Sequence, residues 1–193
     1  MNVCFAPCPV VFDLDGTLID SAPDIHASVN AVLRLNGARL LTLDQVRGFV
    51  GGGVDLLWRR VIAATGLPIE AQRDLVASFM TRYHDATALT RLYPNVTEAL
   101  GVLADRGHPL GICTNKPMGP TRSVLQHFAL DRLFPVVVGG DSLPQRKPDP
   151  APLRLARIVE GEWLLNDGAA IALFGLFLTY VMLGGPYPLL GEA

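Results

Sequence analysis

Two aspartates stand two positions apart, directly after a short apolar stretch near the N-terminus. They are Asp13 and Asp15 in the sequence VVFDLDGTLIDS, which runs from Val10 to Ser21. Two carboxylates held this close repel each other, so a cation is expected between them. Oxygen-rich coordination with few protein ligands suits Mg²⁺, which commonly shares its shell with waters and a substrate phosphate. The pair therefore predicts a magnesium site that serves a phosphorylated ligand.

Two later apolar stretches are also followed by polar residues that could contact a phosphate. Thr114 and Asn115 follow the stretch 110–113, and Lys147 lies on the loop after the stretch 136–140. In an open α/β sheet, ligands bind outside the carboxyl ends of the strands. A hydroxyl, an amide and an ammonium at that edge would donate to phosphate oxygens. Three loops are therefore expected to meet at one site.

The elements that must position these residues alternate along the chain. Strands are predicted over 10–12, 110–113 and 136–140, and helices over 97–105, 122–128 and 150–158. Strands alternating with helices imply a parallel sheet built from right-handed crossover units. The predicted fold class is therefore α/β with a Rossmann-like core. Asp141, which follows the third strand, is interpreted as a loop or capping residue and not as a metal ligand.

The segment between the first two strands has a different pattern. Helices are predicted over 23–35, 54–64 and 70–87, and the segment has no strand of its own. A helical insertion after the first strand predicts a cap over the sheet. The predicted organisation is a core formed by 1–20 and 92–156, a helical cap over 21–91 and an atypical apolar tail over 157–193.

The composition is typical of a globular chain and does not indicate a strongly charged binding partner. Of the 193 residues, half are hydrophobic and 18% are charged, and the net charge of −2 gives no case for binding nucleic acid or an anionic membrane. Three cysteines without a regular framework, and the absence of a signal-peptide pattern, predict reduced thiols in the cytoplasm. The expected partner is a small molecule. The sequence leaves the exact substrate and the oligomeric state open.

The tail is out of character with the rest of the chain. No charged residue occurs from Gly168 to Gly191. This is close to the length that crosses a bilayer, so membrane association through 169–190 is the alternative localisation, although it is not favoured. The other interpretation is a buried strand or helix of a soluble core.

Three motifs carry a resemblance to a known family. DLDGT at 13–17, CTNKP at 113–117 and RKPDP at 146–150 resemble the first three motifs of the haloacid dehalogenase superfamily. The wider sequence over about 10–156 is similar to its bacterial phosphoglycolate phosphatases. The resemblance implies a Mg²⁺-dependent phosphoric monoester hydrolase, which converts 2-phosphoglycolate to glycolate and phosphate.

The resemblance also implies a role for each matching residue. Asp13 would attack phosphorus and form an aspartyl-phosphate, and Asp15 would protonate the leaving alkoxide and then activate water. Mg²⁺ would bridge Asp13, the phosphate and the backbone carbonyl of Asp15. Lys147 and Thr114 would hold the phosphoryl oxygens with help from Asn115. The cap would bring backbone N–H groups near the substrate through three glycines, Gly51, Gly52 and Gly53.

The resemblance breaks after Ala156. The superfamily has a fourth acidic motif whose aspartate completes the Mg²⁺ shell, and here the nearest acidic residue, Asp167, comes several positions early. The sequence EGEWLLNDGAAIALF over 160–174 instead resembles a segment of bacterial sodium/proton antiporters, in which Asn166 and Asp167 match an Asn-Asp pair. A plain turn before a core strand is the other interpretation of this pair. The alternative function is therefore an inactive or impaired phosphatase, truncated at the C-terminal end of its core and joined to an antiporter fragment.

Overall fold

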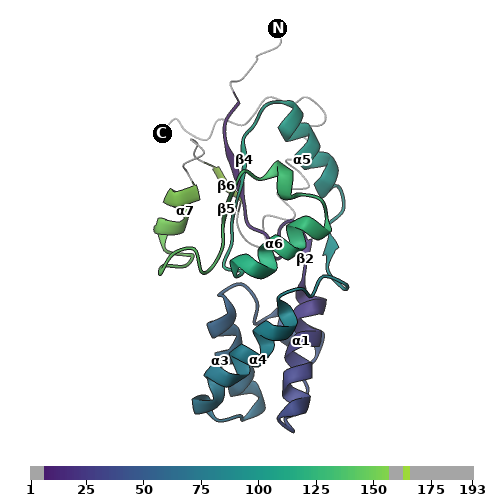
Figure 1. Cartoon of the computed structure of the whole chain (residues 1–193), viewed down its shortest axis with the longest axis vertical. Coiled ribbons are helices and arrows are strands. Elements are labelled where there is room, and N and C mark those ends of the chain that lie inside the picture. Colours follow the sequence, from purple (N-terminus) through teal and green to yellow (C-terminus); the bar gives the residue numbers. More distant parts are fainter. Residues whose placement is uncertain (1–6, 157–162, 166–193) are drawn as a thin grey trace, which may run out of the picture.

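The computed structural model describes residues 7–156 and 163–165, which form a sheet part and a helical part stacked along the long axis (Figure 1). The sheet part contains four parallel strands in the order β5-β4-β1-β6. Their bounds are Val10–Phe12 for β1, Leu110–Cys113 for β4, Val136–Val138 for β5 and Trp163–Leu165 for β6. The predicted α/β fold with a parallel sheet is confirmed.

Alternate side chains of the strands pack against helices on opposite faces of the sheet, as the pleat of a β-strand requires. Phe12 and Ile112 belong to a core formed with α5 (Val96–Asp105) and α6 (Met118–His127). Val11 and Cys113 belong to a second cluster that includes Ala156 of α7 (Pro150–Ala156). Figure 1 shows α7 on one side of the strands, with α5 and α6 on the other. The sheet is therefore covered on both faces.

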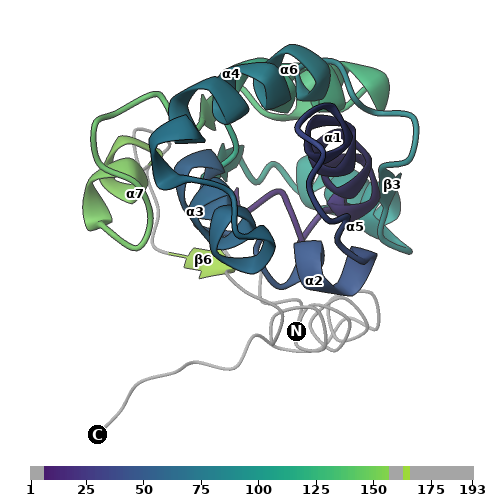
Figure 2. The same cartoon turned by 90° about the horizontal axis from the view of Figure 1, so that it is seen from below.

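The helical part has its own apolar core. Its helices are α1 (Ala22–Leu35), α2 (Leu43–Arg47), α3 (Val54–Thr65) and α4 (Gln72–Tyr83), and a 3₁₀ turn at Ile69–Ala71 precedes α4. Trp58 of α3 is fully buried and packs edge-on against Phe79 of α4, with 5.9 Å between ring centroids. Helices α1 and α3 both contact α4. Figure 2 views the molecule from this helical end.

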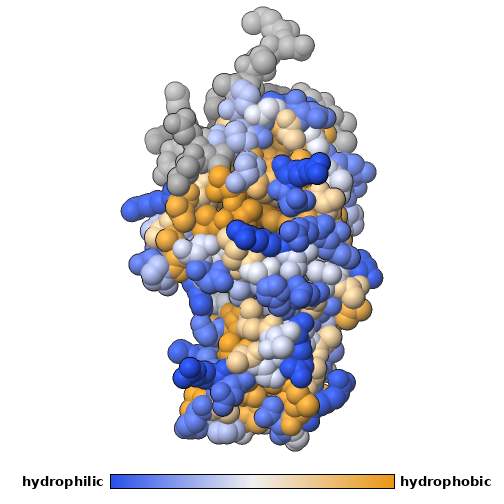
Figure 3. Space-filling model, in the orientation of Figure 1, coloured by the Kyte–Doolittle hydropathy of each residue, from blue (hydrophilic) through white to orange (hydrophobic). Residues whose placement is uncertain are grey.

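The two parts meet at the carboxyl edge of the sheet. A two-stranded antiparallel ribbon, formed by β2 (Ile19–Asp20) and β3 (Arg91–Leu92), joins the segments that leave and re-enter the sheet part. Figure 1 shows α1, α3 and α4 beyond the carboxyl ends of the strands. On the face drawn in Figure 3, hydrophilic and near-neutral residues occupy most of this junction, and the broadest hydrophobic area lies on the sheet part. The division into core and cap at residues 20 and 92 stays a prediction.

Short elements account for most differences from the predicted ones. The sequence pattern predicts neither α2 nor the ribbon nor β6, because elements of two to five residues carry too little periodicity to be recognised. A stronger signal existed for α2, since Thr42 and Gln45 form a capping box at its start. Helix α4 ends at Tyr83 and not at residue 87.

The predictions for the tail concern residues outside the described ones. Among residues 7–156 and 163–165, no helix is both long enough and apolar enough to cross a membrane. The apolar run 169–190 and the pair Asn166 and Asp167 lie outside the described residues. The predicted membrane association and the antiporter resemblance therefore stay predictions.

Candidate active site

A cavity opens where the carboxyl edge of the sheet meets the helical part. Six residues singled out in the sequence line it: Asp13, Asp15, Thr114, Asn115, Gly51 and Gly53. Lys147 is outside this lining but reaches Asp13 with its ammonium. Gly52 instead lines a separate depression beside Arg59 and Arg146. The fold therefore brings the three predicted loops together and places two of the three glycines at the same cavity.

Asp13 is paired with Lys147 at the end of β1. Lys147 Nζ lies 2.8 Å from Asp13 Oδ2, and the backbone N–H of Leu14 donates to Asp13 Oδ1 at 2.8 Å. Burial raises the pKa of the Asp13 carboxyl, and the charge of Lys147 opposes that rise. Among the described residues, Lys147 Nζ has no well-aligned hydrogen bond besides this ion pair. Its N–H groups are therefore available to a ligand that sits beside Asp13.

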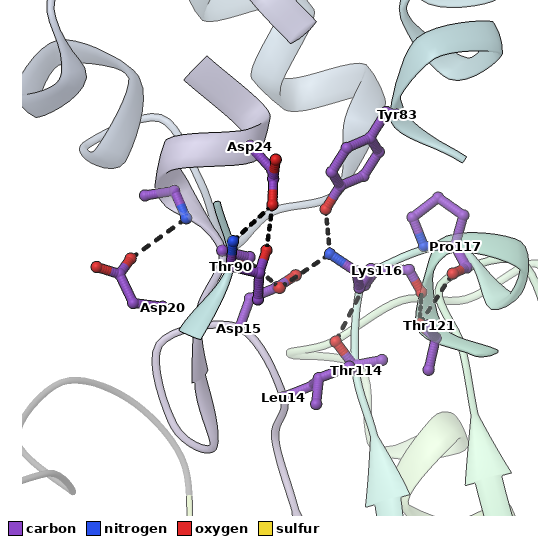
Figure 4. Close-up of polar contacts among 12 residues, drawn as sticks. Leu14, Asp15, Asp20, Asp24, Tyr83, Thr90, Thr114, Lys116, Pro117 and Thr121 are labelled. Carbon is purple, nitrogen blue, oxygen red and sulfur yellow. Dashed lines mark hydrogen bonds and ion pairs between the residues drawn. The ribbon is translucent and has the colours of Figure 1, made fainter. Parts of the chain in front are cut away.

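Asp15 is paired with a second lysine that the sequence analysis did not single out. Lys116 Nζ lies 3.0 Å from Asp15 Oδ1 and also donates to the Tyr83 hydroxyl (Figure 4). The hydroxyl of Ser21 donates to the same Asp15 oxygen at 2.5 Å. The ammonium lies 4.5 Å from the centroid of the Tyr83 ring, within the range of a cation–π contact. Lys116 thus joins the acidic loop to helix α4.

The Lys116 ammonium is a buried charge in a favourable environment. Its side chain is 1% exposed, and such burial alone would lower its pKa. The Asp15 carboxylate and the Tyr83 hydroxyl outweigh that effect, so the pKa of Lys116 is raised above its ordinary value. Burial also raises the pKa of Tyr83. The lysine is therefore a cation and the tyrosine a neutral hydroxyl at neutral pH.

One compositional signal could have pointed to Lys116. Of the chain's 16 lysines and arginines, only two are lysines, and these are Lys116 and Lys147. Each lies within 3.0 Å of one of the two aspartates. An ammonium is a compact point charge, whereas a guanidinium needs space for a planar fork. A chain that uses arginine elsewhere thus has lysine only where a small cation contacts Asp13 or Asp15.

Thr114 and Asn115 occupy the loop that follows β4. The buried Thr114 donates its backbone N–H to Val138 O at 2.9 Å, and its hydroxyl oxygen accepts from the N–H of Lys116 at 3.1 Å. The hydroxyl hydrogen of Thr114 has no partner among the described contacts. It can therefore donate to a ligand in the cavity that Thr114 lines.

The Asn115 side chain connects three loops. Its amide nitrogen donates to Gly51 O at 2.9 Å and to Lys147 O at 3.1 Å, and its oxygen accepts from the Lys147 N–H at 2.9 Å. Gly51 and Gly53 have φ angles of 112° and 84°, which side chains rarely adopt, so glycine is required in this loop. Asn115 thus holds the glycine loop and the Lys147 loop in place. Its predicted contact with phosphate stays a prediction.

We expect Asn115→Ala to lower kcat/KM for phosphate-ester hydrolysis roughly 10–100-fold, because a misplaced Lys147 costs rate even without a lost chemical group. The substitution also removes the partner of backbone groups of Gly51 and Lys147. Steady-state kinetics checks this, with Asn36→Ala as the matched control at the end of α1. An unchanged kcat/KM for Asn115→Ala would show that the bridge does not position the site.

Asp141 accepts a hydrogen bond at the start of α6. Its Oδ1 accepts from the Met118 N–H at 2.8 Å at the first residue of α6. Pro117, the residue before the helix, provides no side-chain cap of its own. Asp141 is therefore a capping residue, as the sequence analysis interprets it.

The site contains part of the set of oxygen ligands that a hard cation prefers. Asp13 and Asp15 supply carboxylate oxygens, the ligands that Mg²⁺ prefers. Within 7–156 and 163–165, no group of three His, Cys, Asp or Glu residues could hold a metal ion. A Mg²⁺ ion that keeps several waters and takes oxygens from a phosphate needs few protein ligands. The arrangement is therefore compatible with this ion held at Asp13 and Asp15.

Comparison with known proteins identifies related sequences. The family model for haloacid dehalogenase-like hydrolases matches residues 10–158. A phosphoglycolate phosphatase of Cereibacter sphaeroides (strain ATCC 17029 / ATH 2.4.9) is 51% identical over 148 residues, which cover 75% of this chain and 68% of that protein. Phosphoglycolate phosphatase 1 of Pseudomonas aeruginosa is 40% identical over 151 residues, which cover 76% and 56% of the two chains.

A solved structure shows the same arrangement of elements. The crystal structure of a predicted phosphoglycolate phosphatase from Haemophilus somnus 129PT superimposes with a TM-score of 0.74 at 33% identity. The match covers 78% of this chain and 70% of that one. The family match ends at residue 158, so it does not bear on the sequence 160–174 that resembles an antiporter.

Proposed function

The chain belongs to the haloacid dehalogenase-like hydrolase family, and from this premise we propose that it hydrolyses 2-phosphoglycolate to glycolate and phosphate. The observation that carries the proposal is the pairing of Asp13 with Lys147 and of Asp15 with Lys116 at one cavity. Relatives and a structural neighbour named as phosphoglycolate phosphatases support the choice of substrate. The activity class is a phosphoric monoester hydrolase.

In the first step, a carboxylate oxygen of Asp13 attacks the phosphorus atom. A bond forms between that oxygen and phosphorus, the bond from phosphorus to the ester oxygen breaks, and Asp15 gives a proton to the leaving alkoxide. In the second step, Asp15 takes a proton from water, whose oxygen attacks the phosphorus of the aspartyl-phosphate. Phosphate leaves and the Asp13 carboxylate is restored.

The phosphoryl oxygens need donors that are fixed before the reaction begins. The Lys147 ammonium lies beside the nucleophile and has N–H groups to offer, and the Thr114 hydroxyl lines the same cavity. Donors held in place at a water-poor site stabilise developing negative charge most effectively. Lys147 and Thr114 would therefore hold the phosphoryl group, while Asn115 holds the Lys147 loop.

Mg²⁺ would be held by Asp13 and by Asp15, and it would supply positive charge to the phosphoryl oxygens.

We place the activity in the cytoplasm, because the described cysteines, Cys8 and Cys113, are free thiols. The expected partner is a small phosphate ester.

Phosphate release from 2-phosphoglycolate tests the proposal. We expect release with Mg²⁺ present and a loss of roughly 100-fold or more after chelation with EDTA, because the charge on the phosphoryl group would then lack its cation. Restoring Mg²⁺ should restore the rate. The alternative, an impaired phosphatase, predicts release no faster than that of heat-inactivated protein, and that result would overturn the proposal.

A further inference from the structure

The cavity has one cationic side chain in its described lining, Lys116. Lys147 is the second lysine of the site, and it lies beside the nucleophile Asp13. The two ammonium groups are therefore paired with different aspartates. A ligand whose phosphoryl group sits beside Asp13 and Lys147 would extend toward Asp15 and Lys116.

The rest of the cavity wall is unsuited to a second negative charge. The helical part contributes Ile25, Val50, Val54, Leu57, Phe79 and Tyr83 to the described lining, besides two glycines. Of these side chains, only Tyr83 carries a polar group, a neutral hydroxyl that accepts from Lys116 and can donate at most one hydrogen bond of its own. Burying a carboxylate against such a wall is costly unless a cation or strong donor meets it. Lys116 is the one cation in the described lining that can do so.

The Lys116 ammonium can also donate one more hydrogen bond. A lysine has three N–H donors. Among the described residues, Lys116 Nζ has two hydrogen-bond partners, Asp15 Oδ1 at 3.0 Å and the Tyr83 hydroxyl. One N–H therefore remains for a ligand, and the two existing contacts hold the ammonium in position. Figure 4 shows Lys116 Nζ between Asp15 and Tyr83.

We propose that Lys116 binds the carboxylate of the substrate and thereby makes the site selective for phosphorylated acids. The inference rests on the proposed function, in which Asp15 serves the ester oxygen. Because Lys116 contacts Asp15, a group that follows the ester oxygen after one carbon lies next to the ammonium. A phosphorylated 2-hydroxy acid has its carboxylate at that place. Lys116 is therefore a specificity-determining residue.

Binding of two inert phosphonates tests the inference without requiring turnover. 3-Phosphonopropionate has the length of phosphoglycolate with a carbon in place of the ester oxygen, and propylphosphonate lacks the carboxylate. By calorimetry, we expect the wild-type chain to bind 3-phosphonopropionate roughly 10–100-fold more tightly, as for a hydrogen bond to a charged group. Lys116→Met should bind both compounds about equally. Arg47→Met, which removes a cation from the exposed pair with Asp20, should keep the preference.

Each outcome separates the inference from the proposed function. A wild-type chain that binds both phosphonates equally, or a Lys116→Met chain that keeps the preference, overturns the role of Lys116 alone. A wild-type chain that binds neither compound, and releases no phosphate from 2-phosphoglycolate, overturns the proposed function and the inference built on it.

A measurement on the unsubstituted chain covers the case in which Lys116→Met does not fold. With two lysines in the sequence, selective ¹³C labelling at lysine Cε gives two NMR signals. The Lys116 signal is recognised by the ring-current shift from Tyr83, whose centroid is 4.5 Å from Nζ. We expect 3-phosphonopropionate to move both signals and propylphosphonate to move that of Lys147 alone. The same pattern with both compounds would overturn the inference.

Discussion

Replacing Asp13 with asparagine is expected to lower phosphate release from 2-phosphoglycolate by about 10⁴-fold or more, the scale of loss when a nucleophile is removed. An amide oxygen is a far weaker nucleophile than a carboxylate, and no other described carboxylate is paired with Lys147. The shape of the side chain is retained, so the cavity should keep its form. The measurement is kcat for wild type and variant under the same Mg²⁺ concentration.

Asp44→Asn is the matched control for this substitution. Asp44 lies in the first turn of α2 and is exposed, so the same chemical change there should leave kcat unchanged. Thermal unfolding of both variants confirms that they are folded. A folded Asp13→Asn chain that retains more than about a tenth of the wild-type kcat would exclude Asp13 as the nucleophile.

Replacing Asp24 with alanine is expected to lower the free energy of unfolding by about 2–4 kcal/mol. The buried Asp24 carboxylate joins the start of α1 to the segment just before β3. Its Oδ2 accepts from the N–H of Leu89 at 3.0 Å, and from the N–H and hydroxyl of Thr90 at 2.6 and 2.7 Å. Alanine leaves the two donors of the fully buried Thr90 without a partner, which is the costly case.

Urea unfolding, followed by circular dichroism, measures this loss. Asp85→Ala is the control, because the Asp85 side chain is 84% exposed and its contacts with His84 and Ser123 lie at the surface. We expect the control to change the free energy of unfolding by less than about 1 kcal/mol. A similarly small change for Asp24→Ala would show that the connection between α1 and Thr90 contributes little to stability.

The sequence predicted those site residues that directly follow a strand. Asp13 follows an apolar stretch that was predicted to be a buried strand, and Thr114 and Asn115 follow another. Because parallel strands bring their carboxyl ends to one edge, their meeting could be expected without knowing the order of the strands. The order β5-β4-β1-β6 itself depends on which strands pair, and no local pattern records that.

The part that sequence reasoning missed depends on contacts between distant segments. Lys116 belongs to the motif CTNKP, in which only the threonine and the asparagine were predicted to contact the ligand. Its two partners, Asp15 and Tyr83, are 101 and 33 positions away in the sequence. Tyr83 is the last residue of α4, and only the packing of the helical part on the sheet part brings its hydroxyl to the cavity. The local sequence shows that a residue is charged, but it does not show which distant residue pairs with that charge.

Chemical trapping of the phosphorylated enzyme tests the central claim most directly. The wild-type chain is quenched during turnover of 2-phosphoglycolate with Mg²⁺, treated with borohydride and digested, and the peptide that contains residues 13 and 15 is sequenced by mass spectrometry. Reduction of an aspartyl-phosphate yields homoserine, so the account predicts homoserine at position 13 and aspartate at position 15. Turnover that leaves Asp13 unmodified under these conditions, or that labels Asp15 in its place, would contradict the account.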